Sequence, residues 1–271
     1  EIYTLSLHDA LPISTSAMAS IFLPTGCLYI IHSLQEAGFA VYLVGGAVRD
    51  HLAKSIGLLA NGQMEIRPDY DFATNATPEE IMKVFPDSFC ENEYGTVSLP
   101  CRKIAAKLGQ NCGDGVSEAS SSPSPIKLER ATKVHESLSL PSAALTHPVE
   151  NYYEITTYRV GEKYERDCRH PSCLHWGQKL TDDLSRRDFT INALALSINS
   201  QYLKNFFAQK NLPTQAQLTE RQWELVDNYH GIADLQANLI RCIGESNQRF
   251  REDGLRLMRA VRLSEIGRGH V

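Results

Sequence analysis

Two aspartates, Asp69 and Asp71, stand two residues apart in this sequence. On a β-strand this spacing puts both carboxylates on one face, close together. Like charges held so close are costly unless a cation lies between them, and hard oxygen ligands suit Mg²⁺. Bound there, two cations would serve an in-line phosphoryl displacement. An isolated Asp-x-Asp is more often a solvated turn, but here Phe72 and Ala73 continue an apolar strand.

A third carboxylate, Glu154, lies in the segment 152–158, whose alternation is typical of a half-buried strand. On a strand next to the aspartates, Glu154 would complete the metal site or accept the proton of an incoming hydroxyl. A glutamate that faces water on an edge strand is the alternative, and the sequence leaves both open.

The pair Gly45-Gly46 follows the apolar segment 39–44 and precedes a helix expected to begin near Ala47. Without side chains, its backbone can approach an anion closely, and the helix start offers unpaired N–H groups. Arg49 lies near this turn and can donate two hydrogen bonds to phosphate oxygens. A tight strand-to-helix turn with a surface arginine is the alternative.

A later segment combines Arg186, Arg187 and Asp188 with Asn192 four residues further on. Arginine donates to phosphate, and carboxylate and amide groups hydrogen-bond ribose hydroxyls. The segment is therefore a candidate clamp for the sugar and phosphates of a nucleotide, although an isolated Arg-Arg-Asp is usually a solvated helix face.

Near the end of the sequence, Glu252, Asp253 and Arg256 have helical spacing and are predicted to share one helix face. Arg259 and Arg262 continue that face. A carboxylate and an arginine side by side can imitate a templating base, whereas plain surface salt bridges are the alternative.

The composition limits the possible partners. The 27 Lys and Arg residues against 32 Asp and Glu residues give a net charge of −5, so any RNA contact requires a local basic patch. No segment reads as a membrane span or a signal peptide. Seven cysteines without tight pairing indicate reduced thiols of the cytoplasm. Zinc is not expected at Cys168, His170, Cys173 and His175, because the cluster lacks a Cys-x-x-Cys pair.

The chain is expected to fall into three parts. Residues 1–20 read like an adapter sequence translated in frame and are taken as non-native. Residues 21–200 are predicted to form a mixed α+β head, with a flexible Ser- and Pro-rich insertion at about 101–150 between two strands. Residues 201–271 are predicted to be a linker and the beginning of a truncated helical neck. Within the head, Thr77, Pro78 and Glu80 predict a capped helix start.

The segments 167–171, 183–194 and 249–262 are the most specific of the chain, and they follow the glycine turn and the aspartates in order. With them, from about Ala37 to Leu263, the chain resembles the class II tRNA nucleotidyltransferase/poly(A) polymerase family. The resemblance implies a polymerase-β-like head with a mixed sheet, then the start of an all-helical neck. The C-terminal body and tail that grip tRNA in that family are missing from this sequence.

The resemblance also implies roles for individual residues. It implies Mg²⁺ at Asp69 and Asp71 and base selection by Asp253 and Arg256. The nucleotide contacts that it implies are Gly46, Arg49, Arg187, Asp253, Arg256, Arg259 and Arg262. Residues 160–181 take the place of the family's flexible loop, which is associated with the switch from C to A addition. Gly254 stands where many relatives carry proline.

The activity implied is the addition of C, C and A to tRNA 3′ ends from CTP and ATP. No membrane and no protein partner is inferred. One alternative is a poly(A) polymerase that extends RNA with ATP, and another is a truncated fragment that binds nucleotide or RNA without catalysis. The intact aspartates, arginines and Asn192 speak against a degenerate relative.

Overall fold

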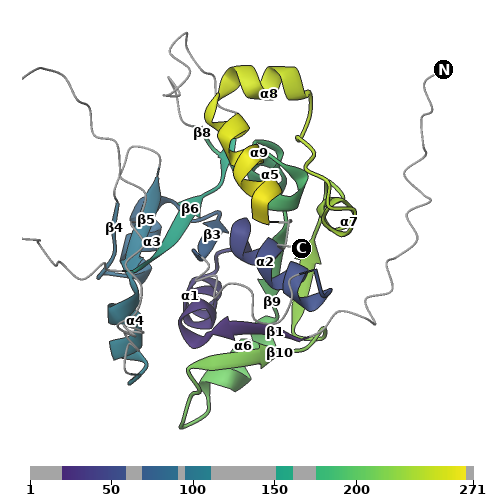
Figure 1. Cartoon of the computed structure of the whole chain (residues 1–271). Helices are drawn as coiled ribbons and strands as arrows, with labels where there is room; N and C mark the ends of the chain where they lie inside the picture. Colours follow the sequence, from purple (N-terminus) through teal and green to yellow (C-terminus); the bar gives the residue numbers. More distant parts are fainter. Residues whose placement is uncertain (1–19, 59–68, 91–94, 111–150, 161–174, 267–271) are drawn as a thin grey trace, which may run out of the picture.

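The computed structural model describes residues 20–58, 69–90, 95–110, 151–160 and 175–266. Its centre is a seven-stranded sheet (Figure 1). The strand order is β11 (Trp223–Val226), β9 (Ala195–Ile198), β2 (Val41–Val44), β3 (Asp71–Thr74), β6 (Tyr152–Thr157), β5 (Thr96–Pro100) and β4 (Phe89–Cys90). Neighbouring strands are antiparallel except for the parallel pair β3–β6. The mixed sheet of the predicted α+β head is thus confirmed.

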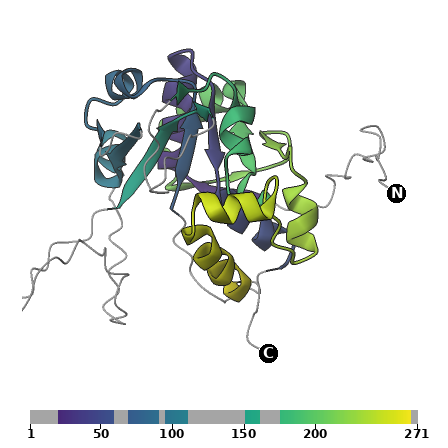
Figure 2. The same ribbon diagram turned by 90° about the horizontal axis from the view of Figure 1, so that it is seen from above.

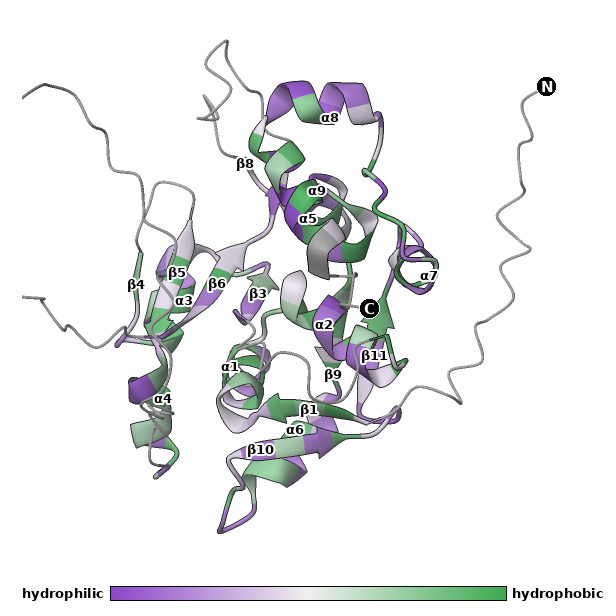
Figure 3. Ribbon diagram, viewed as in Figure 1, coloured by the Kyte–Doolittle hydropathy of each residue, from purple (hydrophilic) through white to green (hydrophobic). Residues whose placement is uncertain are grey.

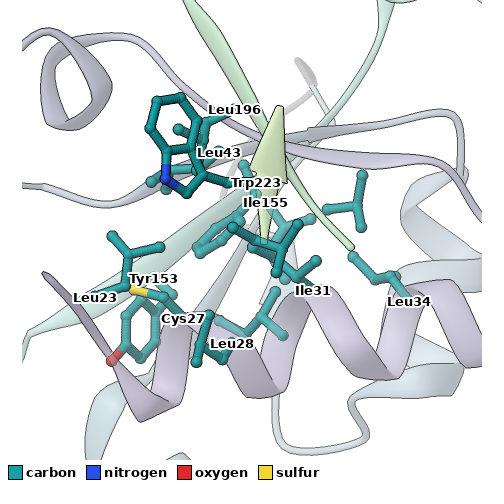
Figure 4. Close-up of a cluster of buried hydrophobic side chains, with 14 of the residues drawn as sticks. Leu23, Cys27, Leu28, Ile31, Leu34, Leu43, Tyr153, Ile155, Leu196 and Trp223 are labelled. Atoms are coloured by element: carbon teal, nitrogen blue, oxygen red, sulfur yellow. The ribbon is translucent and has the colours of Figure 1, made fainter. Parts of the chain in front are cut away.

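Three helices cover one face of this sheet: α1 (Thr25–Glu36), α3 (Pro78–Val84) and α4 (Cys101–Lys107). Every second residue of the strands packs against them in the larger of the apolar cores. Figure 4 shows α1 contributing Leu28, Ile31 and Leu34 to this core. Because strand side chains alternate, the intervening residues point to the opposite face.

The opposite face carries α5 (Leu180–Ser185), which packs over β3. Leu184 joins Val44 and Ala73 in a smaller core there. A 3-10 turn, η2 (Thr190–Asn192), lies next to α2 (Gly46–Ser55), and α2 begins where β2 ends. This second face is less completely covered, and it is the face on which the polar side chains of the site gather.

The segment 202–224, which was predicted to belong to a linker, contains a helix and strands. It contains the end of α6 (Ser200–Phe207) and β10 (Gln215–Leu218), and β10 pairs with β1 (Ile21–Pro24) in a separate two-stranded sheet. β11 then joins the main sheet beside β9. Strands of the head therefore continue past residue 200, where the sequence analysis set its boundary.

β5 and β6 pair antiparallel, so the predicted strands on either side of the long insertion do form a hairpin. The insertion is not wholly flexible, because α4 occupies its first residues. Ile104 anchors that helix in the larger core, a local apolar signal that the Ser- and Pro-rich composition obscured. Residues 111–150 lie outside the described residues.

Beyond β6, the two-residue strands β7 (Arg159–Val160) and β8 (His175–Trp176) pair with each other. Cys168, His170 and Cys173, which were not expected to bind zinc, lie outside the described residues between them. The ring of Trp176 lies against Gly95, where an added Cβ would collide with it. Among the described residues, no helix has the length and apolar character needed to cross a bilayer.

The chain ends in α7 (Gly231–Gln236), α8 (Ser246–Glu252) and α9 (Leu255–Ile266), which lie at one side of the molecule (Figure 2). One continuous helix through residues 252–262 was expected, and this is wrong: the chain breaks at Asp253, which is extended with φ −147° and ψ 108°. The Asp253 carboxylate accepts a hydrogen bond from Leu255 N at 2.9 Å. A short carboxylate side chain caps a helix start better than it fits a helix interior, and Gly254 adds backbone freedom.

The capping box at the start of α3 generates a stability prediction. Thr77 Oγ1 accepts from Glu80 N at 3.3 Å, and Glu80 Oε2 accepts from Thr77 N at 2.8 Å. Thr77→Ala should lower the free energy of unfolding by about 1 kcal/mol, because it leaves a helix N–H without a partner. Thr77→Ser should retain most of the stability, because serine keeps the capping hydroxyl. Urea denaturation measures both, and equal stability of the alanine and serine variants would contradict the role of the cap.

Candidate active site

The strand register places Asp71 at the centre of the candidate site. Asp71 lies opposite Val44 of β2 on one side and opposite Glu154 of β6 on the other. Its neighbour Phe72 points into the larger core, so Asp71 points to the opposite face. Residues in register on adjacent strands share a face, so Glu154 lies on the same side as Asp71.

Asp69 lies before the first residue of β3, but the ladder extends toward it. The carbonyl of Tyr70 accepts a hydrogen bond from Glu154 N at 3.3 Å. The ring of Tyr70 packs against the larger core. The charge of Asp69 acts on the Asp71 carboxyl, so the two residues lie near each other. That both carboxylates share one face stays a prediction.

The pKa of Asp71 is raised to about 7. Burial is the largest cause, followed by the negative charge of Glu154. The positive charge of Arg187 lowers the pKa, and the negative charge of Asp69 raises it further. A carboxylate with a raised pKa has too little positive charge around it to balance its own charge. Its hard oxygen donors fit a divalent cation. Within the described parts of the chain, no three His, Cys, Asp or Glu side chains are gathered as a metal site. β6 lies between β3 and β5, so the alternative of a glutamate on an edge strand is wrong. The roles of Glu154 as a further metal ligand or as a proton acceptor stay predictions.

The glycine turn lies directly beside Asp71. Gly45 has φ 76° and ψ −139°, a conformation that favours glycine, and an added Cβ would stand 3.7 Å from Asp71 Oδ2. The same Cβ would stand 3.2 Å from Arg187 Nη1. Helix α2 begins at Gly46, one residue before the expected start. Its unpaired N–H groups, the Arg187 guanidinium and the Asp71 carboxylate therefore surround one small space.

Asp183, to which the sequence analysis gave no role, holds the two arginines of the clamp segment. Its carboxylate is 1% exposed and lies 3.0 Å from both Arg186 Nη2 and Arg187 Nη2. Burial raises the pKa of Asp183, but the charges of Arg187 and Arg186 outweigh it and leave the pKa below its ordinary value. The spacing of three and four residues on a helix could have revealed this pairing.

Asn192 connects the clamp segment to α2. Its Oδ1 accepts from Arg49 Nη1 at 2.6 Å, and its Nδ2 donates to Asp188 Oδ1 at 3.1 Å. Arg49 also pairs with Asp50 at 2.7 Å and is nearly buried. The other oxygen of Asp188 lies 3.4 Å from Arg259 Nη1. The structure thus brings Arg49, the clamp segment and α9 into one polar network.

The predicted base-reading residues are placed differently from the expectation. Arg256 is 6% exposed and donates to Glu252 Oε2 at 2.8 Å and to Arg249 O at 2.9 Å. Asp253 is on neither helix, so it does not share a helix face with Arg256. Arg262 is exposed on α9, near enough to Asp50 to lower the pKa that burial raises. Arg249 Nη2 donates to Ser185 O at 2.7 Å and fixes α8 to α5.

An aromatic stack lies behind the aspartates, and no sequence signal pointed to it. The ring of Tyr70 lies 6.0 Å from that of His51 and 6.3 Å from that of Tyr153, measured between centroids. Its hydroxyl is 3.4 Å from His51 Nε2. Since Tyr70 stands between Asp69 and Asp71, this stack fixes the segment that carries both carboxylates.

The raised pKa of Asp71 makes a prediction for the protein kept free of divalent cations. A carboxyl whose pKa is about 7 folded and 3.8 unfolded binds its proton more tightly when folded. Its stabilising effect is present below the unfolded pKa and is lost as the pH rises through the folded pKa. At about pH 8, Asp71→Asn should therefore raise the free energy of unfolding by on the order of 1–4 kcal/mol.

Urea denaturation in a chelator, repeated across pH, measures this difference, which should vanish near the unfolded pKa. Asp87, whose side chain is 34% exposed, is the matched control, because hydrogen bonds from Lys107 and Lys103 lower its pKa. Asp87→Asn should not stabilise the protein at high pH. A wild-type protein as stable as Asp71→Asn at that pH would contradict the account.

Comparison with known proteins identifies the family of this chain. The model of the poly A polymerase head domain matches residues 41–110 and 114–241. Over 239 residues the chain is 30% identical to the CCA-adding enzyme of Lactobacillus johnsonii, covering 88% of this chain and 40% of that protein. It is 31% identical to the CCA-adding enzyme of Latilactobacillus sakei, covering 89% and 41%.

A solved structure gives a similar match. The Bacillus stearothermophilus CCA-adding enzyme in complex with CTP is 27% identical with a TM-score of 0.49, covering 88% of this chain and 38% of that chain. The chain thus spans about two fifths of the length of the relatives that it matches. Because the family model covers well over half of the sequence, and the fold is the one expected for it, this protein belongs to the poly A polymerase head domain family.

Proposed function

We propose that this chain is the catalytic head of a nucleotidyltransferase that adds C, C and A to tRNA 3′ ends from CTP and ATP. The observation that carries the proposal is the row of Asp71 and Glu154 beside the Gly45 turn, with Arg187 over that turn. The similarity to CCA-adding enzymes supports the substrate class. Anionic substrate groups fit a helix start and an arginine, and acidic residues next to them fit the metal-dependent transfer of a nucleotide.

In this proposal Asp69 and Asp71 hold divalent cations, with Mg²⁺ as the expected ion. When bound, such ions would neutralise charge on the triphosphate and lower the pKa of the attacking hydroxyl. The N–H groups at Gly46 and the guanidinium of Arg187 bind the triphosphate beside them. Glu154, on the strand beyond Asp71, accepts the proton of the attacking hydroxyl.

Nucleotide choice is assigned to the α8–α9 corner, where Asp253 and Arg256 would contact the base and Arg259 and Arg262 the phosphates. The contacts of Arg256 with Glu252 and Arg249 hold its guanidinium in one orientation. The exposed arginines of α9 project from the same side as Asp188 and Asp50, next to the clamp segment. Base selection there needs a local opening, because Arg256 has little exposed surface.

A poly(A) polymerase is the second candidate, favoured by the description of the matching family. A poly(A) polymerase would use the same catalytic residues, so the two candidate functions differ in the RNA that is extended and in the use of CTP. A chain that only binds nucleotide is the third, since it spans about two fifths of its relatives. Extension of unstructured RNA by ATP alone would favour the second, and binding without any extension would favour the third.

The metal assignment makes the first test. Asp71→Asn should reduce nucleotide addition to a tRNA lacking its CCA end by on the order of 1,000-fold or more, because it removes a charged ligand of the cations. Nucleotide binding should persist, since Arg187 and the turn are unchanged. Asp87→Asn, which removes a partly exposed carboxylate paired with Lys103 and Lys107, is the control. Substantial residual transfer by Asp71→Asn would sink the assignment.

Base selection makes the second test. Arg256→Gln should shift the ratio of C to A addition more than it lowers the overall rate, because a neutral amide offers a different donor pattern. Glu252→Gln is the matched control, since it weakens the same ion pair but leaves the guanidinium in place. If the ratio is unchanged in Arg256→Gln, or changes equally in Glu252→Gln, Arg256 does not read the base. Primer-extension assays with each nucleotide measure the ratio.

A further inference from the structure

The row of residues that contains Asp71 and Glu154 continues across the sheet. Ser98 of β5 lies opposite Glu154, and Phe89 of β4 lies opposite Ser98. Partners in register share a face, so Phe89, Ser98, Glu154 and Asp71 all point to the same side of the sheet. The candidate site therefore has an extension toward β4 that the proposed chemistry does not use.

This extension carries exposed aromatic surface. Phe89 is 41% exposed, although it is a large apolar side chain. Its ring meets that of Tyr152 edge to face, with centroids 5.6 Å apart and an interplanar angle of 90°. Tyr152 lies two residues before Glu154 on the same strand, so it shares that face. Figure 3 shows β4 as a hydrophobic strand at the outer edge of the sheet.

The charges show which substrate approaches from which side. Gly45, Arg187 and Arg49 all lie on the β2 side of Asp71, and these are the groups suited to the triphosphate. The attacking RNA end must then reach the α-phosphate from the β6 side. Strands are about 4.8 Å apart, so Phe89 stands about 10 Å across the sheet from Glu154, roughly the span of a nucleotide from sugar to base.

Two further groups on this face suit an RNA end. The hydroxyl of Ser98 is buried and has no hydrogen-bond partner. A buried hydroxyl without a partner calls for an explanation, and a ligand hydroxyl supplies one. Thr96 lies two residues before Ser98 on β5, and its Oγ1 accepts a hydrogen bond from Arg159 Nη2 at 3.3 Å. Arg159 thus brings positive charge to the side where a backbone phosphate would lie.

We propose that Phe89 and Tyr152 form the stacking platform for the 3′-terminal base of the acceptor RNA, with Ser98 Oγ bound to the 2′-hydroxyl of its ribose. The inference rests on the proposed function, because the β2 side is assigned to the triphosphate. Aromatic rings bind single-stranded RNA by stacking on its bases, with little dependence on sequence. Because Ser98 is 1% exposed, the ribose reaches its hydroxyl only after the side chains that cover it move.

Binding of a short, fluorescently labelled single-stranded RNA to the 271-residue chain, followed by anisotropy, tests the platform. Phe89→Leu and Tyr152→Leu should each weaken binding about tenfold, while Tyr152→Phe should bind as the wild type does. Phe22, an aromatic residue 47% exposed on the separate two-stranded sheet, is the control. Absence of RNA binding by the wild-type chain, or an equal loss in Phe22→Leu, would overturn the proposal. Thermal melting checks that each variant is folded.

The role of Ser98 is tested with an RNA whose last ribose is 2′-deoxy. The wild type should bind the ribose end more tightly, and Ser98→Ala should bind both ends alike. An undiminished preference for ribose in Ser98→Ala would remove Ser98 from the site. CTP affinity should be unchanged in every platform variant. A failure of the proposed catalysis would appear as transfer by Asp71→Asn, whereas a failure of this inference appears as unchanged RNA binding.

Discussion

The mutual repulsion of Asp71 and its acidic neighbours is the constraint on which the site depends. Asp71 and Glu154 lie on one face because β3 and β6 run parallel with these two residues in register, and the charge of Asp69 also acts on Asp71. Burial then raises the cost of leaving Asp71 charged. One arginine, Arg187, opposes this cost only in part, and it is itself shared with Asp183. Added positive charge would therefore stabilise this region, which is the electrostatic argument for the proposed cation site.

The opposite face of the sheet maintains this unfavourable arrangement. Phe72 is buried in the larger core, and the ring of Tyr70 stacks on His51 and packs at a tilt against Tyr153. A shift of β3 by one residue would expose Phe72 and bury a carboxylate among apolar side chains. The apolar face thus fixes the register that forces the acidic side chains together, and stability elsewhere offsets strain at the site.

The sequence was most informative where the signals are local. The Thr77 capping box, the two strands on either side of the insertion and the apolar strand that follows Asp71 each depend on a few adjacent residues, and the structure has them. The sequence analysis offered Glu154 on a strand next to the aspartates as one alternative, and the β3–β6 pairing confirms that position. The sequence alone left the alternatives open, because this parallel pairing joins residues far apart in the chain. The break at Asp253 was missed for another reason: the charge spacing fits a helix, but a capping carboxylate followed by Gly254 favours a new helix start. The pairing of Asp183 with Arg186 and Arg187 could have been predicted, because their spacing of three and four residues is typical of ion pairs on a helix, but the sequence analysis did not consider it.

The arginines of the site are already paired before any ligand arrives. Asp183 holds Arg187, Asp50 holds Arg49, and Glu252 holds Arg256. In a chain of net charge −5, such pairing keeps guanidinium groups in place that would otherwise sample many rotamers. An incoming phosphate must compete with these carboxylates, so part of its attraction is cancelled, but the donors need little reordering. The pairing thus lowers the affinity for phosphate but keeps the arginines in a fixed geometry. The proposed transfer reaction, which depends on in-line alignment, is favoured by that geometry.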